Sequence, residues 1–179
     1  MVSNNNQYNW KIEHSRVINC DIERVWEVIS MRSNLEAFHP FCKSNRVTEW
    51  PGKGAVDEIE YLNGLTLERN FIDWMDKTGY DLYIFQAGRP ASHVSWRIVK
   101  KDDKTNISII ISPYLFNQGH KLFNLLPFFL ITKPLLSNYL KHVINGLKLY
   151  AEKGVRVKNN QFGKNFLFSH ADTGTGEEA

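Results

Sequence analysis

Two side chains, His39 and Arg69, are the strongest candidates for chemistry in this sequence. His39 lies beside Pro40 in an aromatic turn, where an imidazole could act as a general base or serve as a structural hydrogen-bonding group. Arg69 shares a strand phase with Leu67 and Phe71, so its guanidinium could point inward and hold a carboxylate, phosphate or enolate oxygen. It could equally turn to solvent or pair with a glutamate, because a buried arginine needs a partner.

The usual signatures of catalysis and cofactor binding are absent from the sequence. It contains no HExxH motif, paired CxxC motif, glycine-rich phosphate loop or nucleophile elbow, and its six histidines are scattered. Asp73, Glu58 and Glu60 are possible acids, but charged side chains on strands usually face water, and the sequence shows no pairing among them. We therefore expect no metal ion and no cofactor.

The N-terminal segment and the two cysteines favour a reducing compartment. Residues 1–8 are polar and lack the basic and apolar regions of a signal peptide, so we expect a cytoplasmic protein. Cys20 and Cys42 are then expected to be free thiols and not a disulfide framework.

The composition fits one domain without a nucleic-acid partner. With 179 residues, 42% of them hydrophobic, the chain can bury about 70% of its unfolded surface. The aromatic content of 13% either fills an ordinary core or lines a pocket. The formal charge of +3 is mild, and interspersed charges form no nucleic-acid-binding stripe. One basic stretch could be a solvated face or meet anionic lipid; it comprises Lys148, Lys153, Arg156, Lys158 and Lys164.

The elements that must position the candidate residues begin with a strand and two short helices. Residues 10–19 have the length and the β-branched content of a strand. Asp21 can cap a helix that runs from Ile22 to about Met31 and has one apolar side. Residues 33–38 are expected to form a second helix, closed by His39 and Pro40 because the residue before a proline avoids the helical region.

Six further strands are predicted from turns at hairpin spacing. The turns lie at residues 51–54, 63–64, 76–79, 87–90 and 101–104, and they are rich in glycine, proline, asparagine and aspartate. Alternation supports the assignment, since Val94, Trp96 and Ile98 share one strand face. Together with the first strand, the sequence predicts about seven antiparallel strands.

The last helix has the clearest pattern in the chain. Pro134 suits its first turn, and Gly154 can cap its far end in a left-handed conformation. About 20 residues at 1.5 Å each make a rod of about 30 Å. We therefore predict an α+β fold in which a curved antiparallel sheet grips this helix. The apolar stripe, about five turns long, comprises Leu136, Leu140, Val143, Ile144, Leu147, Tyr150 and Ala151.

Residues 115–132 form an apolar segment between the sheet and the last helix. Lys121, Asn124 and Pro127 interrupt it, and it is shorter than the roughly 20 apolar residues that a membrane span needs. It could be an extra layer of core, an amphipathic lid over a cavity mouth, or an interface with a membrane or a partner. Residues 155–168 are expected to pack as an extension, and residues 172–179 to be mobile.

The order of strand, two short helices, six strands and a long helix resembles the helix-grip superfamily (SRPBCC), which contains START domains, Bet v 1 and bacterial polyketide cyclase/dehydrase-like proteins. Residues 17–30, VINCDIERVWEVIS, resemble the opening strand-to-helix segment of the family, including its Val-Trp pair. Leu35, residues 38–41, the turn at 52–54 and the strand at 67–69 continue the pattern. The resemblance covers residues 10–154 and is to the polyketide cyclase/dehydrase-like branch. Cys20-Asp21 replaces a small residue and proline, and residues 115–132 are longer and more apolar than usual.

The resemblance implies an apolar cavity between the concave face of the sheet and the closing helix. It implies binding or transport of a lipid-like or polyketide-like molecule, without a cofactor. Two alternatives stay open, namely a cyclase or dehydratase with His39 as its base, and a membrane- or partner-binding module through residues 115–132. The residues expected to contact a ligand are Arg69, Phe71, Trp96, Tyr114, Leu136, Leu140, Val143, Ile144 and Leu147.

The expected domain organisation is simple. A polar segment (residues 1–9) precedes a single ligand-binding domain (residues 10–154), and an extension (residues 155–179) with a mobile acidic end follows it. The expected partner is a hydrophobic small molecule, with a peripheral membrane contact as a further possibility and no nucleic acid. The sequence does not indicate an oligomeric state.

Overall fold

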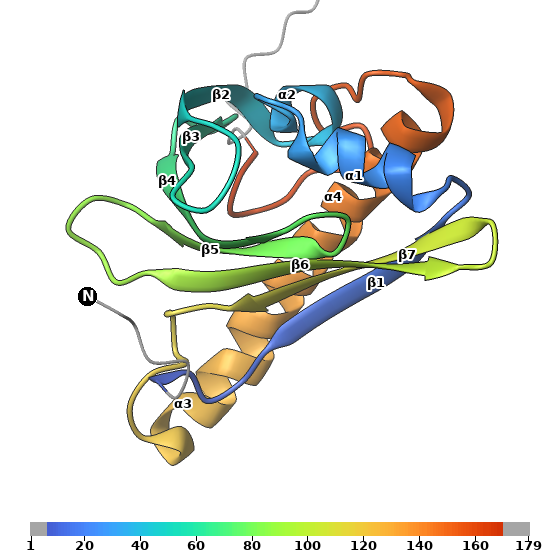
Figure 1. The fold of residues 1–179 in the computed structure, drawn as a ribbon. Coiled ribbons are helices and arrows are strands. Elements are labelled where there is room, and N and C mark those ends of the chain that lie inside the picture. The colour runs from blue at the N-terminus through green and yellow to red at the C-terminus, as the bar shows by residue number, and fades with distance from the viewer. Residues whose placement is uncertain (1–6, 170–179) are drawn as a thin grey trace, which may run out of the picture.

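The computed structural model describes residues 7–169 and shows a curved antiparallel sheet that grips a long helix (Figure 1). The seven strands lie in the order β1-β7-β6-β5-β4-β3-β2. They are β1 (Ile12–Ile18), β2 (Cys42–Glu49), β3 (Val56–Tyr61), β4 (Thr66–Met75), β5 (Gly79–Phe85), β6 (Ser92–Lys101) and β7 (Lys104–Ser112). The helices are α1 (Ile22–Ser30), α2 (Leu35–Phe38), α3 (Lys121–Pro127), the π-helical turn η2 (Phe128–Thr132) and α4 (Lys133–Lys153). The predicted α+β helix-grip architecture is confirmed.

Hairpins build most of the sheet, and each of the five predicted turns joins two neighbouring strands. Gly79, at the start of β5, shows why the turn residues matter. Its φ is +140°, and a Cβ atom there would lie 1.9 Å from the carbonyl oxygen of Trp96 on β6. Only glycine can therefore occupy this position without moving the strands apart.

The two short helices cross one end of the sheet, beside the C-terminal part of α4 (Figure 1). The side chain of Asp21 caps α1 by accepting a hydrogen bond of 2.7 Å from the backbone N–H of Arg24, as the sequence predicts. The backbone of α2 comes very close to α4 at Gly146. A Cβ atom on Gly146 would lie 2.0 Å from the carbonyl oxygen of Phe38, so this glycine sets how closely the helices approach.

Helix α4 has the ends and the buried side that the sequence predicts. Pro134 lies in its first turn, and Gly154 terminates it with a φ of +67°. The N–H of Gly154 donates a 2.8 Å hydrogen bond to the carbonyl oxygen of Tyr150. The buried stripe packs against the sheet, and its fully or nearly fully buried members include Leu140, Val143, Ile144, Leu147 and Ala151.

Five aromatic side chains, centred on Trp74, pack together, and none of them lines the cavity described below. Trp50 and Trp74 meet edge to face with ring centroids 5.1 Å apart, and Phe71 lies 5.1 Å from Trp50. Trp26 of α1 and Tyr80 of β5 complete the cluster at 5.6 and 5.3 Å from Trp74. This cluster is an ordinary aromatic core, built from edge-to-face contacts and from the stacked pair of Trp74 and Tyr80.

Residues 115–132 do not form an extra layer of core, which was one of the expectations. Helix α3 and η2 extend α4 beyond the edge of the sheet (Figure 1), and most of their apolar side chains are exposed. Within α3 and η2, Phe128 and Thr132 are the buried residues. No described helix is both long and apolar enough to cross a membrane.

The chain after α4 packs against α2 and the residues that follow it. The N–H of Val157 bonds to the carbonyl oxygen of Ala37 (3.0 Å), and that of Asn160 to the carbonyl oxygen of Pro40 (2.9 Å). Phe168 is buried at the end of this path. The extension therefore packs on the α2 region over residues 155–169, whereas the expected mobile end at residues 172–179 lies outside the described residues.

Candidate functional site

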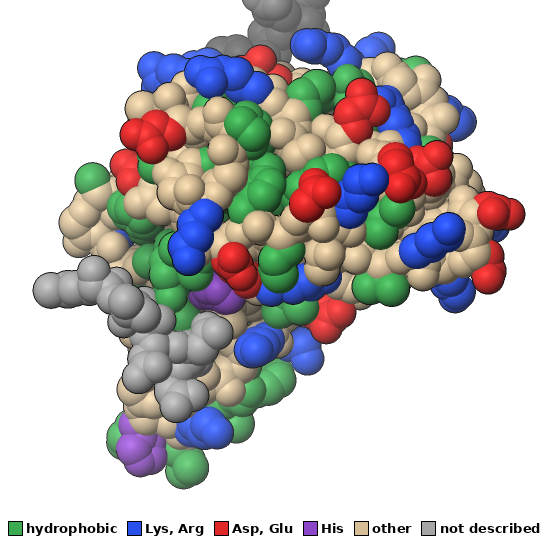
Figure 2. All heavy atoms as spheres, in the orientation of Figure 1, with side chains coloured by type: hydrophobic (Ala, Val, Ile, Leu, Met, Phe, Trp, Pro, Cys, Tyr) green, Lys and Arg blue, Asp and Glu red, His purple; other side chains and the backbone are tan. Residues whose placement is uncertain are grey.

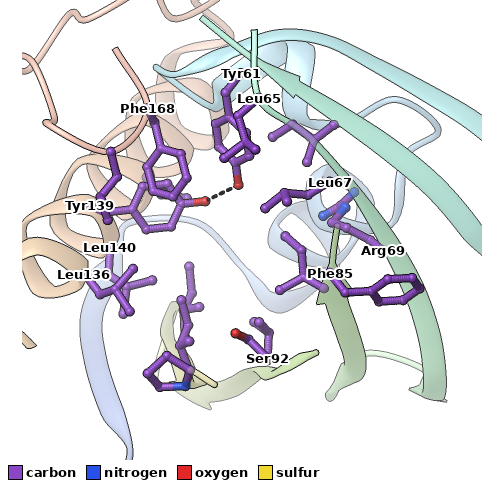
Figure 3. Close-up of a pocket in the computed structure, with 18 of the residues that line it drawn as sticks. Tyr61, Leu65, Leu67, Arg69, Phe85, Ser92, Leu136, Tyr139, Leu140 and Phe168 are labelled. Carbon is purple, nitrogen blue, oxygen red and sulfur yellow. Dashed lines mark hydrogen bonds between the residues drawn. The ribbon is translucent and has the colours of Figure 1, made fainter. Parts of the chain in front are cut away.

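A cavity of about 270 Å³ lies between the concave face of the sheet and α4 (Figure 3). Its walls come from strands β3 to β7, from α2 and α4, and from the C-terminal segment. Most lining side chains are aliphatic or aromatic. They include Leu35, Ile59, Leu67, Leu82, Ile84, Val94, Trp96, Ile109, Ile111, Leu136, Leu140 and Val143.

A short chain of polar groups interrupts this apolar lining. His39, which ends α2, contacts the hydroxyl of Tyr139 through Nε2 at 2.9 Å. Its other nitrogen, Nδ1, accepts a 3.2 Å bond from the N–H of Phe41, so the hydrogen of the neutral ring is on Nε2 and is donated to Tyr139. The Tyr139 and Tyr61 hydroxyls are 3.2 Å apart, as the dashed line in Figure 3 marks.

Burial keeps these three groups neutral. It lowers the pKa of His39 to about 3, and the positive charge of Arg69 acts in the same direction. Burial likewise raises the pKa of Tyr139 to about 12 and holds the pKa of Tyr61 well above its ordinary value. At neutral pH the polar chain is therefore an uncharged imidazole and two uncharged phenols.

Arg69 points inward, as one of the sequence alternatives proposed, and its partner is an aspartate of the neighbouring strand. Nε donates to Asp57 Oδ1 at 2.6 Å, and Nη2 forms a second short bond to Oδ2. Both side chains are almost completely buried. Burial alone would lower the pKa of Arg69, but the charge and hydrogen bonds of Asp57 raise it above the ordinary value. The two side chains therefore form a buried, doubly hydrogen-bonded ion pair.

The guanidinium of Arg69 also has N–H donors that are not bonded to Asp57. Arg69 lines the cavity, and among the described residues its hydrogen bonds use only Nε and Nη2. The amino group at Nη1 is therefore available to an oxygen atom inside the cavity. Ser92, at the opposite end of Figure 3, accepts a 3.1 Å bond from the N–H of Tyr114 and can donate its own hydrogen.

The mouth of the cavity lies beside the projecting helical segment. Three lining residues are exposed, namely Gln86 after β5, Leu115 after β7, and Ile131 of η2. The opposite part is closed by aromatic rings, because Phe168 stacks on Tyr61 at 4.2 Å and packs on Tyr139 at 4.6 Å. The cavity is therefore open at the α3 end and closed at the polar chain.

The structure places seven of the ten predicted site residues in the cavity wall. They are His39, Arg69, Trp96, Tyr114, Leu136, Leu140 and Val143. Phe71 instead belongs to the aromatic cluster around Trp74, and Ile144 and Leu147 are completely buried in the core. The possible acids Asp73, Glu58 and Glu60 do not line the cavity. Glu58 and Glu60 form ion pairs with Arg46 and Lys43.

Sequence reasoning missed four important site residues. Asp57 and Tyr61 are in phase with the buried Ile59, so the period-two pattern of β3 was an available signal. Tyr139 lies three residues after Leu136, which is a helical spacing. Phe168 comes from a segment without regular structure, and no sequence pattern places it in the cavity.

The described residues contain no group of three or more histidine, cysteine, aspartate or glutamate side chains that could hold a metal ion. Cys20 and Cys42 are both free. Burial raises the pKa of the Cys42 thiol to about 12, so this cysteine is a poor nucleophile at neutral pH.

Comparisons with known proteins identify relatives in structure only. No protein-family model matches the sequence, and no curated protein matches it. DynU16, from the dynemicin biosynthetic locus, has a TM-score of 0.64 at 12% identity over 82% of this chain, which spans 48% of DynU16. The Aha1 dimer from Colwellia psychrerythraea has a TM-score of 0.60 at 11% identity, with 81% of this chain and 98% of that chain covered.

Ara h 8.0201 has a TM-score of 0.54 at 13% identity, with 79% of this chain and 97% of that chain covered. Identities this low establish a shared fold and no shared activity. The chain therefore has the helix-grip fold found in Bet v 1-like, Aha1 and other SRPBCC proteins.

Proposed function

We propose that the protein binds a hydrophobic or amphipathic small molecule in this cavity and does not transform it. The observation that carries the proposal is an open apolar cavity with a few convergent polar groups at its closed end. Sites for small organic molecules generally combine apolar walls with a few polar groups that fix orientation. The helix-grip fold is compatible with this function, and the apolar lining and open mouth of the cavity support it directly.

The volume suggests a small ligand or the end of a longer one. An apolar cavity of about 150 Å³ holds benzene, so by proportion 270 Å³ accommodates about eleven non-hydrogen atoms. A bicyclic aromatic system or a medium-length acyl chain has this size. Because the mouth is open beside Leu115 and Ile131, a longer tail could extend out of the cavity.

The polar chain favours a ligand with an acceptor oxygen at its inner end. His39 donates to Tyr139, and one tyrosine hydroxyl donates to the other. Whichever tyrosine donates, the hydrogen of the second hydroxyl has no partner among the described residues. That hydrogen and the Nη1 group of Arg69 can bind a carbonyl, hydroxyl or carboxylate oxygen. A phenol, a ketone or a fatty acid would fit this arrangement.

The environment of His39 argues against the alternative of a cyclase or dehydratase that uses it as a base. A pKa of about 3 makes the ring a weak proton acceptor at neutral pH. Both of its nitrogens are also engaged, one with Phe41 and one with Tyr139. This favours the structural role for His39, which orients the hydroxyl of Tyr139.

A displacement titration tests the proposal. A fluorescent apolar probe such as 1-anilinonaphthalene-8-sulfonate is bound to the protein, and decanoic acid or 2-naphthol is then added as a competitor. Leu136→Trp fills the cavity and should weaken probe and competitor binding at least tenfold, whereas Val99→Trp, on the exposed end of β6, should not. Equal affinity in both variants would show that the cavity is not the binding site.

A further inference from the structure

The segment formed by α3 and η2 (Lys121–Thr132) carries half of the exposed large hydrophobic residues in the part of the chain that the structure describes. Nine of the fourteen exposed large hydrophobic residues in the described part of the chain lie between Leu115 and Ile131. Leu122, Phe123 and Leu130 are exposed to 79, 82 and 71% of their surface. Contiguous apolar patches of this kind mark interaction sites in folded proteins. We call the patch formed by Leu122, Phe123, Leu126 and Leu130 the apolar platform.

The platform is an ordered surface with a defined direction. Leu122, Leu126 and Leu130 recur every four residues, so their side chains line one side of the helical segment. The opposite side is fixed to the protein by Phe128, whose ring lies 4.8 Å from Trp10. The amide of Asn124 also donates a 2.7 Å bond to the carbonyl oxygen of Gln118. The apolar side chains are therefore held pointing away from the protein.

The charge around the platform indicates what it binds. From Lys104 to Ala151 the sequence contains five lysines and no aspartate or glutamate. Lys121 begins α3, and Lys133 lies directly after η2 with Nζ 5.1 Å from the centre of the Phe129 ring. Figure 2 shows hydrophobic and basic side chains together on the visible face of this projecting lobe. An apolar helix face bordered by lysines is complementary to an anionic membrane surface.

We propose that the apolar platform docks on the surface of an anionic lipid bilayer. Leu122, Phe123, Leu126 and Leu130 would enter the boundary between headgroups and acyl chains, while Lys121 and Lys133 contact lipid phosphates. The segment lies in the interface and does not cross it, since no described helix is long and apolar enough to span a membrane.

Docking in this way would place the cavity mouth against the bilayer. Ile131 belongs both to the cavity wall and to the exposed side of η2, and Leu115 also lines the mouth. An apolar ligand could then pass between the membrane and the cavity without crossing water. This consequence rests on the proposed function, whereas docking itself depends only on the platform.

Vesicle sedimentation of the full chain tests the proposal. The probes are vesicles of phosphatidylcholine alone and of phosphatidylcholine mixed with phosphatidylglycerol. The protein should sediment with the mixed vesicles and much less with the neutral ones. Leu122→Ser combined with Phe123→Ser should weaken binding at least tenfold. The matched control combines Val99→Ser and Phe166→Ser, two exposed sites of 61 and 87% outside the platform, and should bind like the wild type.

A second pair of variants tests the role of charge. Lys121→Gln with Lys133→Gln should reduce binding to mixed vesicles several-fold, whereas Lys100→Gln with Lys101→Gln, at the β6–β7 hairpin, should not. Binding that is unchanged by the platform variants would overturn the proposal. The proposal would also be overturned if the wild type formed a stable dimer that does not bind vesicles and if the Leu122→Ser, Phe123→Ser protein were monomeric. In that case the platform would be covered by a second copy of the chain.

The cavity variant separates this inference from the proposed function. Leu136→Trp should lose the fluorescent probe and still sediment with anionic vesicles. The platform variant (Leu122→Ser with Phe123→Ser) should still bind the fluorescent probe in its cavity, but it should no longer sediment with anionic vesicles. If Leu136→Trp abolished both properties while remaining folded, the platform would not be an independent docking surface.

Discussion

The buried state of His39 predicts a specific pH dependence of folding stability. In the native protein its pKa is lowered to about 3 by burial and by the charge of Arg69. In the unfolded chain the imidazole has its ordinary pKa of about 6.5. Between these two values the unfolded state binds more protons than the native state. The contribution of His39 is therefore complete above pH 6.5 and is lost as the pH falls towards 3.

The magnitude follows from the two pKa values. Between pH 7 and pH 5, protonation of His39 in the unfolded chain alone lowers the free energy of unfolding by about 2 kcal/mol. Other histidines contribute as well, since burial also lowers the pKa values of His14, His93 and His142. The test therefore compares wild type with His39→Gln, in which an amide can still donate to Tyr139.

The assay is urea unfolding of both proteins at pH 5, 6 and 7, followed by circular dichroism. From pH 7 to pH 5 the wild type should lose about 2 kcal/mol more than His39→Gln, because the remaining histidines cancel in the comparison. Equal losses in the two proteins would refute the reasoning, since His39 would then have a similar pKa in the folded and unfolded states.

Three further predictions concern the contacts that shape the cavity. Asp57→Asn should lower the free energy of unfolding by about 3–5 kcal/mol, because it leaves the Arg69 charge buried without its partner. The double variant Asp57→Leu with Arg69→Met should lose much less stability. Equal losses of the two variants in urea unfolding would contradict a buried ion pair. Tyr139→Phe should lower the free energy of unfolding by about 1–3 kcal/mol by leaving the His39 donor unsatisfied. In the displacement titration it should weaken the binding of 2-naphthol more than that of an apolar competitor. An equal effect on both competitors would show that the polar groups at the closed end of the cavity do not contact the ligand. Gly146→Ala should cost about 1–3 kcal/mol or more, because its Cβ would overlap the carbonyl oxygen of Phe38; an unchanged melting temperature would show that α2 moves freely away from α4.

Local signals in the sequence were sufficient to predict the architecture. The Asp21 cap, the five hairpin turns and the Pro134 and Gly154 ends of the last helix each depend on residues close together in the chain. Helical and alternating periodicities then assign the faces, which is why Trp96, Leu136 and most other predicted lining residues face the cavity.

The rest of the site depends on contacts between distant segments. Asp57 meets Arg69 because β3 and β4 pair in one particular register, and periodicity alone does not specify that register. Phe71 has the same strand phase as Arg69, yet a register shift between Phe71 and Asp73 accompanies its packing on Trp50. Phe168 reaches the cavity only through the path of the C-terminal segment.

The apolar segment before α4 illustrates the same limit. Its composition was compatible with core, lid or interface, and composition cannot decide how far a helix extends past the sheet. The structure shows α3 and η2 beyond the sheet edge, with Leu122 and Phe123 exposed. The decisive property is therefore the absence of covering residues within the described part of the chain.

The central claim is that the cavity holds an apolar small molecule, and native mass spectrometry tests it most directly. The full chain is purified from its own host under mild conditions, its native mass is compared with its denatured mass, and any released molecule is identified by extraction. Our account predicts a stoichiometric apolar or amphipathic molecule with an acceptor oxygen on the wild type, and none on Leu136→Trp. Wild-type protein that carries no ligand and also fails to bind apolar probes, or an identical adduct on Leu136→Trp, would contradict it.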